Sequence, residues 1–308
     1  MIASYPKVMN YGNSGTENAL VGEVIIQEKV DGSQFRWGFD NDGNFVMGSH
    51  NCEMFYPTDN KLFKDAIEYI YRDKNSGMAN LFFFAECLCK PKHNTLKYDT
   101  IPTNHLMIFD VLRNGAWCPV DELVHWANFW GVDYARELYR GTIENSLEGI
   151  KSLSRFLDTD SYLGGTKIEG IVVKNYNQYI QIGTHVWPIF TKYVNPAFRE
   201  KNDGSHKADR PDLEAFLRSF ATEARWNKAI QHLNEQDKLV HGVQDIGPLI
   251  QEIHKDIPEE ESETIKHYLY RHFIKAILSR ATNGFPEWYK AKIINDMYGK
   301  KEAADEQA

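Results

Sequence analysis

The sequence predicts an α+β fold, with a first domain of mixed, largely antiparallel sheets and flanking helices followed by an all-helical C-terminal domain. Strand-like apolar runs between residues 21 and 200 are joined by several hairpin turns, which favours α+β over a doubly wound parallel sheet. Helical patterns with almost no strand signal fill the chain after residue 204. A polar segment with Gly and Pro, 199–212, separates the two patterns. We therefore expect domains at 1–203 and 204–308.

The elements of the first domain follow from apolar spacing. Strands are expected at 23–30 and 33–39, and an Asp-Gly turn at 42–43 should connect the second of them to a further strand. A surface helix is expected at 61–73, where apolar residues recur at helical spacing. The remaining elements, in order, are strands at 80–89 and 105–112, helices at 119–131 (ending at Gly131) and 146–158, strands separated by a polar turn at 167–182, and a strand at 186–194.

The second domain should consist of four helices. One of them carries His267, Arg271 and Lys275 at four-residue intervals, with Leu269, Phe273 and Ile277 on another face. These basic residues form either a ridge that grips phosphates or an ordinary solvated face. The helices are expected at 211–235, 243–255, 259–280 and 285–299, and the linker before them adds the basic residues Arg199, Lys201, Lys207 and Arg210.

Composition limits the classes of function. The 308 residues, 42% of them hydrophobic, can bury a substantial core. The apolar runs are too short for a membrane span and the N-terminus lacks a signal-peptide pattern, so we expect a soluble, non-secreted, cytoplasmic protein. A formal charge of -8 argues against coating nucleic acid by bulk electrostatics. The cysteines lack zinc-type spacing and are expected to be reduced thiols in or near the core.

A lysine between apolar segments needs an explanation, because burying an ammonium ion is costly. In "IIQEKVDGSQFRWGF", Lys29 ends a strand-like run and forms the pattern K-x-D-G with Asp31 and Gly32. A four-residue pattern also arises by chance, and a strand-end lysine beside a turn would explain it equally well. Other parts of the sequence must decide.

Further motifs follow Lys29 in a fixed order. They are Glu86 after "FFFA", Phe109 in "MIFDV", "EGIVVK" at 169–174, and Lys192 in "FTKYV". Together they resemble the motifs of the covalent nucleotidyltransferase superfamily, which contains ATP-dependent ligases and capping enzymes. The resemblance covers about residues 20 to 200 and identifies the first domain as an adenylyltransferase domain.

Within that superfamily the sequence is most similar to the RNA ligase 2 type. Lys192, Asn195, Phe198 and Glu200 form the string K-x-x-N-x-x-F-x-E of that group, which also carries a helical C-terminal domain. DNA ligases and capping enzymes of the superfamily instead append an OB barrel, and nothing after residue 205 reads as five short strands. The resemblance therefore implies an ATP-dependent RNA ligase, with ATP and Mg²⁺ or Mn²⁺ as cofactors.

The chemistry of such a ligase requires a neutral lysine. An amine with a pKa near 10.4 is neutral in only about one molecule in a few thousand at pH 7, and lowering the pKa by about 3 takes on the order of 4 kcal/mol. Lys174, Lys192 and a divalent cation are the candidates for lowering it. Lys29 would then attack the α-phosphorus of ATP, and the two other lysines would stabilise charge on the phosphates.

The resemblance also implies roles for the remaining site residues. Glu169 would hold the metal, Glu86 would contact the ribose, and Phe109 would stack on adenine. Asp31 and Gly32 belong to the nucleotide-binding motif of Lys29. Each role has an alternative: core packing for Phe109, a structural salt bridge for Glu86, and for Glu28 either contact with the adenine amino group or an exposed position on the strand.

Three positions depart from the family pattern. His50 stands in "GSHN" where an arginine is usual, Phe190 replaces the first of two lysines, and Ala85 stands where glycine is usual. Only a protonated imidazole keeps the charge of the arginine, so we expect greater pH sensitivity. These changes leave the first chemical step in place and put the efficiency of later steps in question.

The resemblance implies joining of RNA ends with a 5′-phosphate and a 3′-hydroxyl, most simply at a nick in a duplex, by a monomer without membrane association. A DNA nick ligase shares all the chemistry, and a capping guanylyltransferase shares the first step but uses GTP. A third alternative is a nucleic-acid-binding protein of the same fold that has lost activity. A compact ligase would suit a phage-like RNA repair enzyme, by analogy alone.

Overall fold

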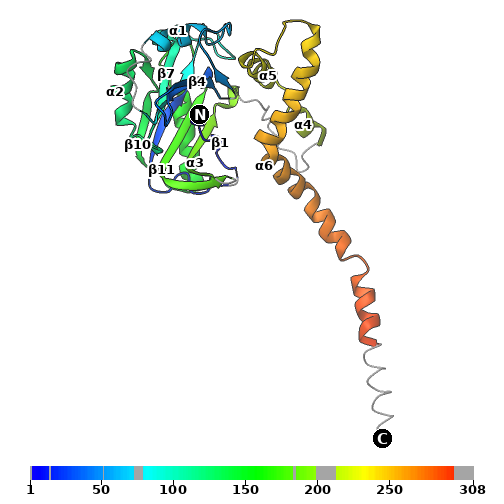
Figure 1. Cartoon of the computed structure of the whole chain (residues 1–308). Helices are drawn as coiled ribbons and strands as arrows, with labels where there is room; N and C mark the ends of the chain where they lie inside the picture. Colours follow the sequence, from blue (N-terminus) through cyan, green and yellow to red (C-terminus); the bar gives the residue numbers. More distant parts are fainter. Residues whose placement is uncertain are drawn as a thin grey trace. The chain divides into compact units, whose positions relative to one another are not determined.

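The structure is a computed structural model that describes residues 2–13, 15–50, 52–72, 79–182, 185–198 and 213–294. It divides into two compact units, 1–260 and 261–308. The first unit contains every named strand (Figure 1). The strands are β1 Met9–Asn10, β2 Glu23–Lys29, β3 Ser33–Phe39, β4 Phe45–Ser49, β5 Glu53–Met54, β6 Leu81–Cys87, β7 Leu106–Arg113, β8 Ala116–Trp117, β9 Asp133–Tyr134, β10 Glu137–Thr142, β11 Gly170–Ile182 and β12 His185–Val194.

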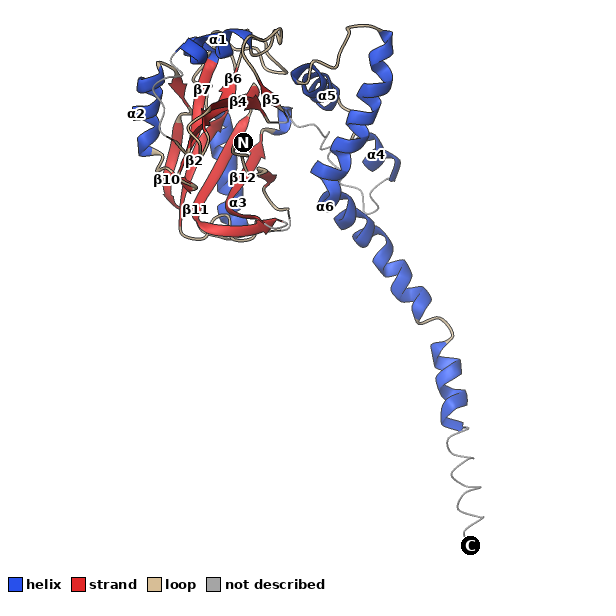
Figure 2. Cartoon of the chain, in the orientation of Figure 1, coloured by secondary structure: helices blue, strands red, loops and turns tan. Residues whose placement is uncertain are grey.

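The strands form two sheets (Figure 2). The five-stranded sheet has the order β1-β12-β11-β2-β10, and the seven-stranded sheet has the order β5-β4-β3-β6-β7-β8 with β9 paired to β7. All pairs are antiparallel except β1 with β12 and β7 with β9. The prediction of an α+β fold with mixed, largely antiparallel sheets is therefore confirmed.

Helices cover the outer face of each sheet. The helices α1 (Lys64–Arg72) and α2 (Asp121–Trp130) pack on the seven-stranded sheet, where their apolar residues join Phe35, Trp37 and Phe83 in one core. The helix α3 (Leu147–Ser152) and the 3-10 turn η2 (Leu153–Asp158) cover the five-stranded sheet. Gly131 ends α2 in the left-handed conformation at φ 61°, as the sequence predicted.

Strand alternation decides which side chains face inward, between the sheets. On β6, Phe83 and Ala85 belong to the outer core, so Phe82, Phe84 and Glu86 lie on the other face. Phe82 and Phe84 pack in an inner aromatic cluster with residues of the N-terminal segment and β12. The apolar cluster around Phe82 and Phe84 thus lies on the same face of β6 as the acidic residue Glu86.

The predicted polar turn within 167–182 is wrong. The structure has one long strand, β11, that pairs with β12 on both sides of an irregularity between Asn175 and Tyr179. The buried side chain of Asn175 accepts hydrogen bonds from the amides of residues 177 and 178 and donates to the carbonyls of Ala19 and Val21. This side chain satisfies the backbone where the register shifts, so the strand continues instead of turning.

The described residues after 212 form helices, as predicted, but with different boundaries. The region 211–235 contains α4 (Leu213–Arg218) and α5 (Glu223–Glu235), because Thr222 caps α5 through a hydrogen bond from Arg225 N. The two helices predicted at 243–255 and 259–280 are one helix, α6 (Ile246–Ala281), which continues through Pro258. Residues 285–294 are also helical.

The domain boundary at 203/204 lies outside the described residues and stays a prediction. Short 3-10 turns complete the fold: η1 Thr103–His105, η3 Pro196–Phe198 and η4 Val243–Asp245. None of the helices that the structure describes has the length and apolar character needed to cross a membrane.

Candidate active site

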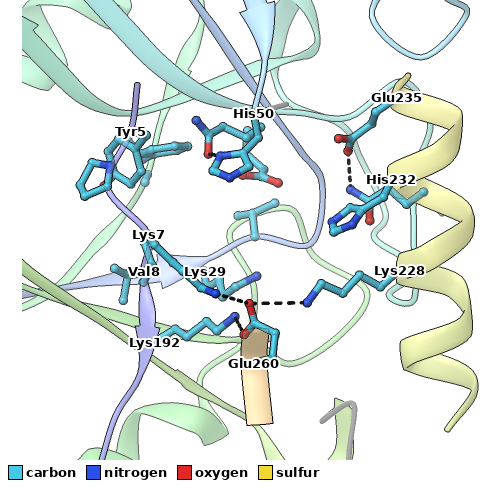
Figure 3. A pocket seen from close by; sticks show the side chains of 18 of the residues that line it. Tyr5, Lys7, Val8, Lys29, His50, Lys192, Lys228, His232, Glu235 and Glu260 are labelled. Atoms are coloured by element: carbon cyan, nitrogen blue, oxygen red, sulfur yellow. Dashed lines mark hydrogen bonds and ion pairs between the residues drawn. The ribbon is translucent and has the colours of Figure 1, made fainter. Parts of the chain in front are cut away.

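A cavity of about 580 Å³ opens between the inner faces of the two sheets (Figure 3). Strands β2, β11 and β12 contribute to one wall and β3, β6 and β7 to the other, while residues of α5 and of α6 before Glu261 close it further. The site residues predicted from the sequence that line this cavity are Glu28, Lys29, His50, Glu86, Phe109, Lys174 and Lys192.

Lys29 is the last residue of β2, where it pairs with Gly170 of β11. Its Nζ donates to both carboxylate oxygens of Glu169, at 2.8 and 2.6 Å. The backbone amide of Asn195 donates to the Glu169 carbonyl at 2.8 Å, so the predicted string after Lys192 helps to hold the glutamate in place. The sequence thus brings together residues that lie 140 positions apart.

The expected lowering of the Lys29 pKa does not appear in the free protein. Burial alone would lower the pKa, but the carboxylates of Glu169 and Glu86 outweigh it and raise the pKa of Lys29 above its usual value. Burial conversely raises the pKa of Glu86 to about 8 and that of Glu169 to about 7. Lys29 is therefore held as a paired ammonium ion, and activation requires ligands that change this charge balance.

Asp31 and Gly32 shape the turn after Lys29. Asp31 accepts hydrogen bonds from the backbone amides of Thr95 and Leu96, each at 2.8 Å, which ties the turn to a distant loop. The amide of Gly32 donates to Glu86 Oε1 at 3.1 Å. A Cβ on Gly32 would come within 2.6 to 2.7 Å of neighbouring atoms, including the Cys87 carbonyl oxygen, so this position requires glycine.

Lys174 forms a buried ion pair with Asp110. Its side chain is 1% exposed, and its Nζ lies 2.6 Å from Asp110 Oδ2 and 2.6 Å from the carbonyl oxygen of Phe109. Asp110 also accepts hydrogen bonds from the hydroxyls of Tyr5 and Tyr176. Because Asp110 already neutralises the ammonium, Lys174 is a poor source of the positive field expected to act on Lys29, and its phosphate role stays a prediction.

The aromatic residues of the site differ in accessibility. Phe109 is half-buried and lines the cavity, so part of its ring can meet a ligand, although the ring also packs on Tyr5 at 5.1 Å between centroids. Phe190 is only 2% exposed and belongs to the inner aromatic cluster. Its packing there explains why an apolar residue is tolerated at this position.

Glu28 is buried, which rules out the alternative of an exposed strand residue. Its carboxylate accepts hydrogen bonds from the hydroxyl of Ser161 and the amide of Tyr162, and Arg136 lies 3.2 Å away. These contacts satisfy the charge of the carboxylate. Contact with an adenine amino group would have to compete with them.

His50 lines the cavity with Nδ1 3.1 Å from Gln34 Oε1. Desolvation and the positive charges of Arg36, His232 and Lys7 lower the pKa of His50, while Glu260 acts in the opposite direction. The imidazole is therefore neutral at pH 7 and does not replace the charge of an arginine.

Three further residues of the cavity escaped the sequence reasoning: Lys7, Lys228 and Glu260. The Glu260 carboxylate lies 3.0 Å from Lys192 Nζ, 3.8 Å from Lys7 Nζ and 3.9 Å from Lys228 Nζ (Figure 3). No motif marks them, because they come from the N-terminal segment, α5 and α6 and meet only in the folded chain. The linear sequence held no signal that could have grouped them.

The other predicted basic residues remain undecided. His267, Arg271 and Lys275 are exposed on α6, but so are Leu269, Phe273 and Ile277, and the phosphate ridge stays a prediction. Glu200 and the basic linker residues Arg199, Lys201, Lys207 and Arg210 lie outside the described residues.

The donor set suits a hard divalent cation bound largely by water and phosphate. Glu169 and Glu86 provide carboxylate oxygens near Lys29, and in the described part of the chain no group of three or more acidic, His or Cys side chains could hold a metal by itself. Mg²⁺ is commonly bound through one or two carboxylates together with substrate phosphates and water. The cysteines are free thiols, as expected.

The facing sheets, with Lys29 at the end of β2 and the other motifs around it, have the arrangement expected of a covalent nucleotidyltransferase. A family model described as RNA ligase matches residues 22–193, more than half of the chain. The chain therefore belongs to the RNA ligase family.

Two structures illustrate the extent of similarity. An RNA ligase of Naegleria gruberi with pyrophosphate is 16% identical, with a TM-score of 0.48, and the match covers 64% of this chain and 57% of that one. A putative ATP-dependent DNA ligase from Aquifex aeolicus is 18% identical, with a TM-score of 0.42, and covers 82% of this chain and 64% of that one. The chain thus spans less than two thirds of either protein. No curated protein matches it.

Proposed function

We propose that this protein is an ATP-dependent RNA ligase that joins a 3′-hydroxyl to a 5′-phosphate, with nicked duplex RNA as substrate. The observation that carries the proposal is the position of Lys29, which lines a cavity and is hydrogen-bonded to Glu169, within the region that matches the RNA ligase family. A solvated structural lysine would not need a cavity large enough for a nucleotide.

In the first step, the Lys29 Nζ–phosphorus bond would form as the bond from the α-phosphorus to the leaving pyrophosphate breaks. Lys29 must lose a proton before it attacks, and Glu169 holds its Nζ in place until then. Lys192 lies on the adjoining part of the sheet, where its cation can stabilise charge that develops on the phosphates. Phe109 offers an aromatic face to the base, and Glu86 lies where a ribose hydroxyl could be bound.

Glu169 would hold the divalent cation, with Glu86 as the second nearby carboxylate. When bound, Mg²⁺ or Mn²⁺ would neutralise phosphate charge and reduce the hold of Glu169 on Lys29. In the later steps AMP would pass to the 5′-phosphate of the nucleic acid and leave when the 3′-hydroxyl attacks.

The choice of RNA over DNA is supported by family membership and by the helical region after residue 212. Sealing of a 5′-labelled nick should be compared in four duplexes, with RNA or DNA on each side of the break. The proposal predicts that an RNA strand ending in the 3′-hydroxyl is joined at least about tenfold faster than its DNA counterpart, because an A-form end and its 2′-hydroxyl are recognised.

A pre-adenylylated 5′ end, supplied without ATP, tests the last step alone. Joining of DNA ends at equal or greater rate would favour the DNA ligase alternative. Binding of duplex RNA without adenylylation or joining of any substrate would favour the inactive binding protein, and labelling with GTP in preference to ATP would favour a guanylyltransferase.

A further inference from the structure

The end of the cavity beyond Lys29 gathers cations around one carboxylate. Lys7, Lys192 and Lys228 come from three separate elements and surround Glu260 at 3.0 to 3.9 Å (Figure 3). The side chains of Lys192, Lys228 and Glu260 are only 16%, 20% and 15% exposed. Glu260 is the carboxylate that all three ammonium groups approach, and Asp256, 2.7 Å from Lys228, is a second one, so the three lysines keep a local excess of positive charge.

Other charged groups border this cluster without removing that excess. Asp256 lies 2.7 Å from Lys228 but is also bound to the buried Arg225. His232 is paired with Glu252 at 3.0 Å. Lys7 Nζ also donates to the backbone carbonyl of residue 259, at 3.0 Å. Asp256 thus has a second cation to balance, and Glu260 remains the carboxylate that Lys7, Lys192 and Lys228 share.

The position of Glu260 fits an anion site filled by a side chain. The three lysines outweigh burial and lower the pKa of Glu260 to about 2, so its carboxylate stays ionised at any physiological pH. A carboxylate and a phosphate present similar oxygens to ammonium groups. The Glu260 carboxylate thus lies where the three ammonium groups converge.

We propose that Lys7, Lys192 and Lys228 form a binding site for the two terminal phosphates of a nucleoside triphosphate, and that Glu260 fills this site until the polyphosphate displaces it. The identity of the polyphosphate rests on the proposed function. Lys192 lies across β11 from Gln27, which is two residues before Lys29 on the same face of β2, so the site lies where the leaving pyrophosphate of the adenylylation step would emerge. A nucleic-acid 5′-phosphate has the same chemistry and is the competing source.

Two consequences follow from an anion site with an internal occupant. The polyphosphate must displace Glu260, so part of its binding free energy is lost to that exchange. After pyrophosphate leaves, Glu260 can return to the lysines and oppose the reverse reaction. Removing its charge should therefore strengthen binding of pyrophosphate and make adenylylation more easily reversed.

The test measures binding of inorganic pyrophosphate by calorimetry to the full chain carrying Lys29→Ala, so that no chemistry intervenes. Adding Glu260→Gln should tighten binding about tenfold, and adding Lys228→Gln or Lys7→Gln should weaken it about fivefold or more, because charged hydrogen bonds are lost. The matched control is Glu148→Gln. It removes the same charge from an exposed side chain of α3 that does not line the cavity, so a change within about twofold is expected.

A parallel titration with a short RNA carrying a 5′-phosphate, against the same RNA with a 5′-hydroxyl, separates the two sources. Selective tightening of the 5′-phosphate RNA by Glu260→Gln, with pyrophosphate unaffected, would overturn the polyphosphate assignment. Equal pyrophosphate affinity in all folded variants, with folding checked by thermal melting, would overturn the site itself. Adenylylation of the chain with Lys29 intact is scored separately, so a failure of the ligase proposal is distinguishable from a failure here.

Discussion

At the residue scale, the site is a problem of charge balance around one amine. Glu169 and Glu86 keep the pKa of Lys29 raised in the free protein, although burial acts in the opposite direction. A lysine in this state stays protonated and is not yet a nucleophile. A divalent cation, bound together with the substrate phosphates, would have to engage the same carboxylates before the amine could become a nucleophile.

The turn at Gly32 allows a direct test of the backbone contribution. Replacing Gly32 with alanine should cost about 1 to 3 kcal/mol in the free energy of unfolding and reduce adenylylation strongly, because the new Cβ would contact Leu88, the Cys87 carbonyl and Glu86. Urea unfolding and labelling with ATP measure the two effects.

Gly247→Ala in α6 is the control for this substitution. A Cβ there meets open space, so the variant should be neutral or more stable by up to about 1 kcal/mol. If Gly32→Ala and Gly247→Ala had the same free energy of unfolding and the same extent of adenylylation, the close contacts at Gly32 would not explain a need for glycine there.

His50 carries the pH dependence that the sequence suggested. Its pKa is lowered by desolvation and by Arg36, His232 and Lys7, so the imidazole is neutral at pH 7.5 and gains charge only when the pH falls below its usual value of about 6.5. His50→Arg should therefore tighten binding of a non-reactive ATP analogue about threefold or more at pH 7.5.

At pH 5.5 the difference between wild type and His50→Arg should narrow, because the protonated fraction of the wild-type imidazole rises as the pH falls. Both affinities are measured at the two pH values by calorimetry, with the same buffer ionic strength. An affinity ratio that does not change with pH would contradict a role for the charge at this position.

At the element scale, strand alternation turns single motifs into a site. Adjacent antiparallel strands place Gln27 and Lys29 of β2 beside Val172 of β11 and Lys192 of β12, and each of these residues lines the cavity. The seven-stranded sheet contributes Glu86 and Phe109 by the same logic. The faces of β6 could not be predicted from the sequence, because every residue from Leu81 to Ala85 is apolar and no alternation marks the outer core.

Part of β11 was not predictable either. The polar run after Lys174 reads as a turn in sequence, but Asn175 makes its hydrogen bonds to the loop near Ala19, which no local pattern reveals. Asp110 was also not predicted as the buried partner of Lys174, because it directly follows the motif residue Phe109 within a strand-like run. Both errors concern polar groups whose partners are far away in sequence.

The Lys174 and Asp110 pair links β11 with β7 and should matter for stability. Asp110→Asn leaves a buried ammonium without its counter-charge and should lower the free energy of unfolding by about 3 to 5 kcal/mol. Adding Lys174→Met should recover a large part of that loss, since the unpaired charge is removed. Urea unfolding of both single variants and the double variant gives the coupling energy, and additive losses would contradict the pair as the source.

At the scale of the whole molecule, most of the longer elements and the change from sheets to helices could be read from the sequence, but the strand β10 could not. The grouping of strands into two sheets, the continuation of α6 through Pro258 and the meeting of Lys7, Lys228 and Glu260 could not. They depend on contacts between segments separated by up to about 250 residues, such as Lys7 with residue 259. The family motifs indicate where the candidate catalytic residues lie, whereas no motif marks the residues of α5 and α6 that line the cavity.

The central claim is that Lys29 becomes covalently linked to AMP. The most direct measurement is incubation of the purified chain with α-phosphate-labelled ATP and Mg²⁺, followed by denaturation, intact mass and peptide mapping. The matched control is Lys64→Ala, which removes an exposed lysine paired only loosely with Glu68 at 4.0 Å. The account predicts label on wild type and Lys64→Ala, mapped to Lys29, and none on Lys29→Ala. Absence of label on wild type with ATP, GTP or Mn²⁺, with prior adenylylation excluded by mass, would contradict it.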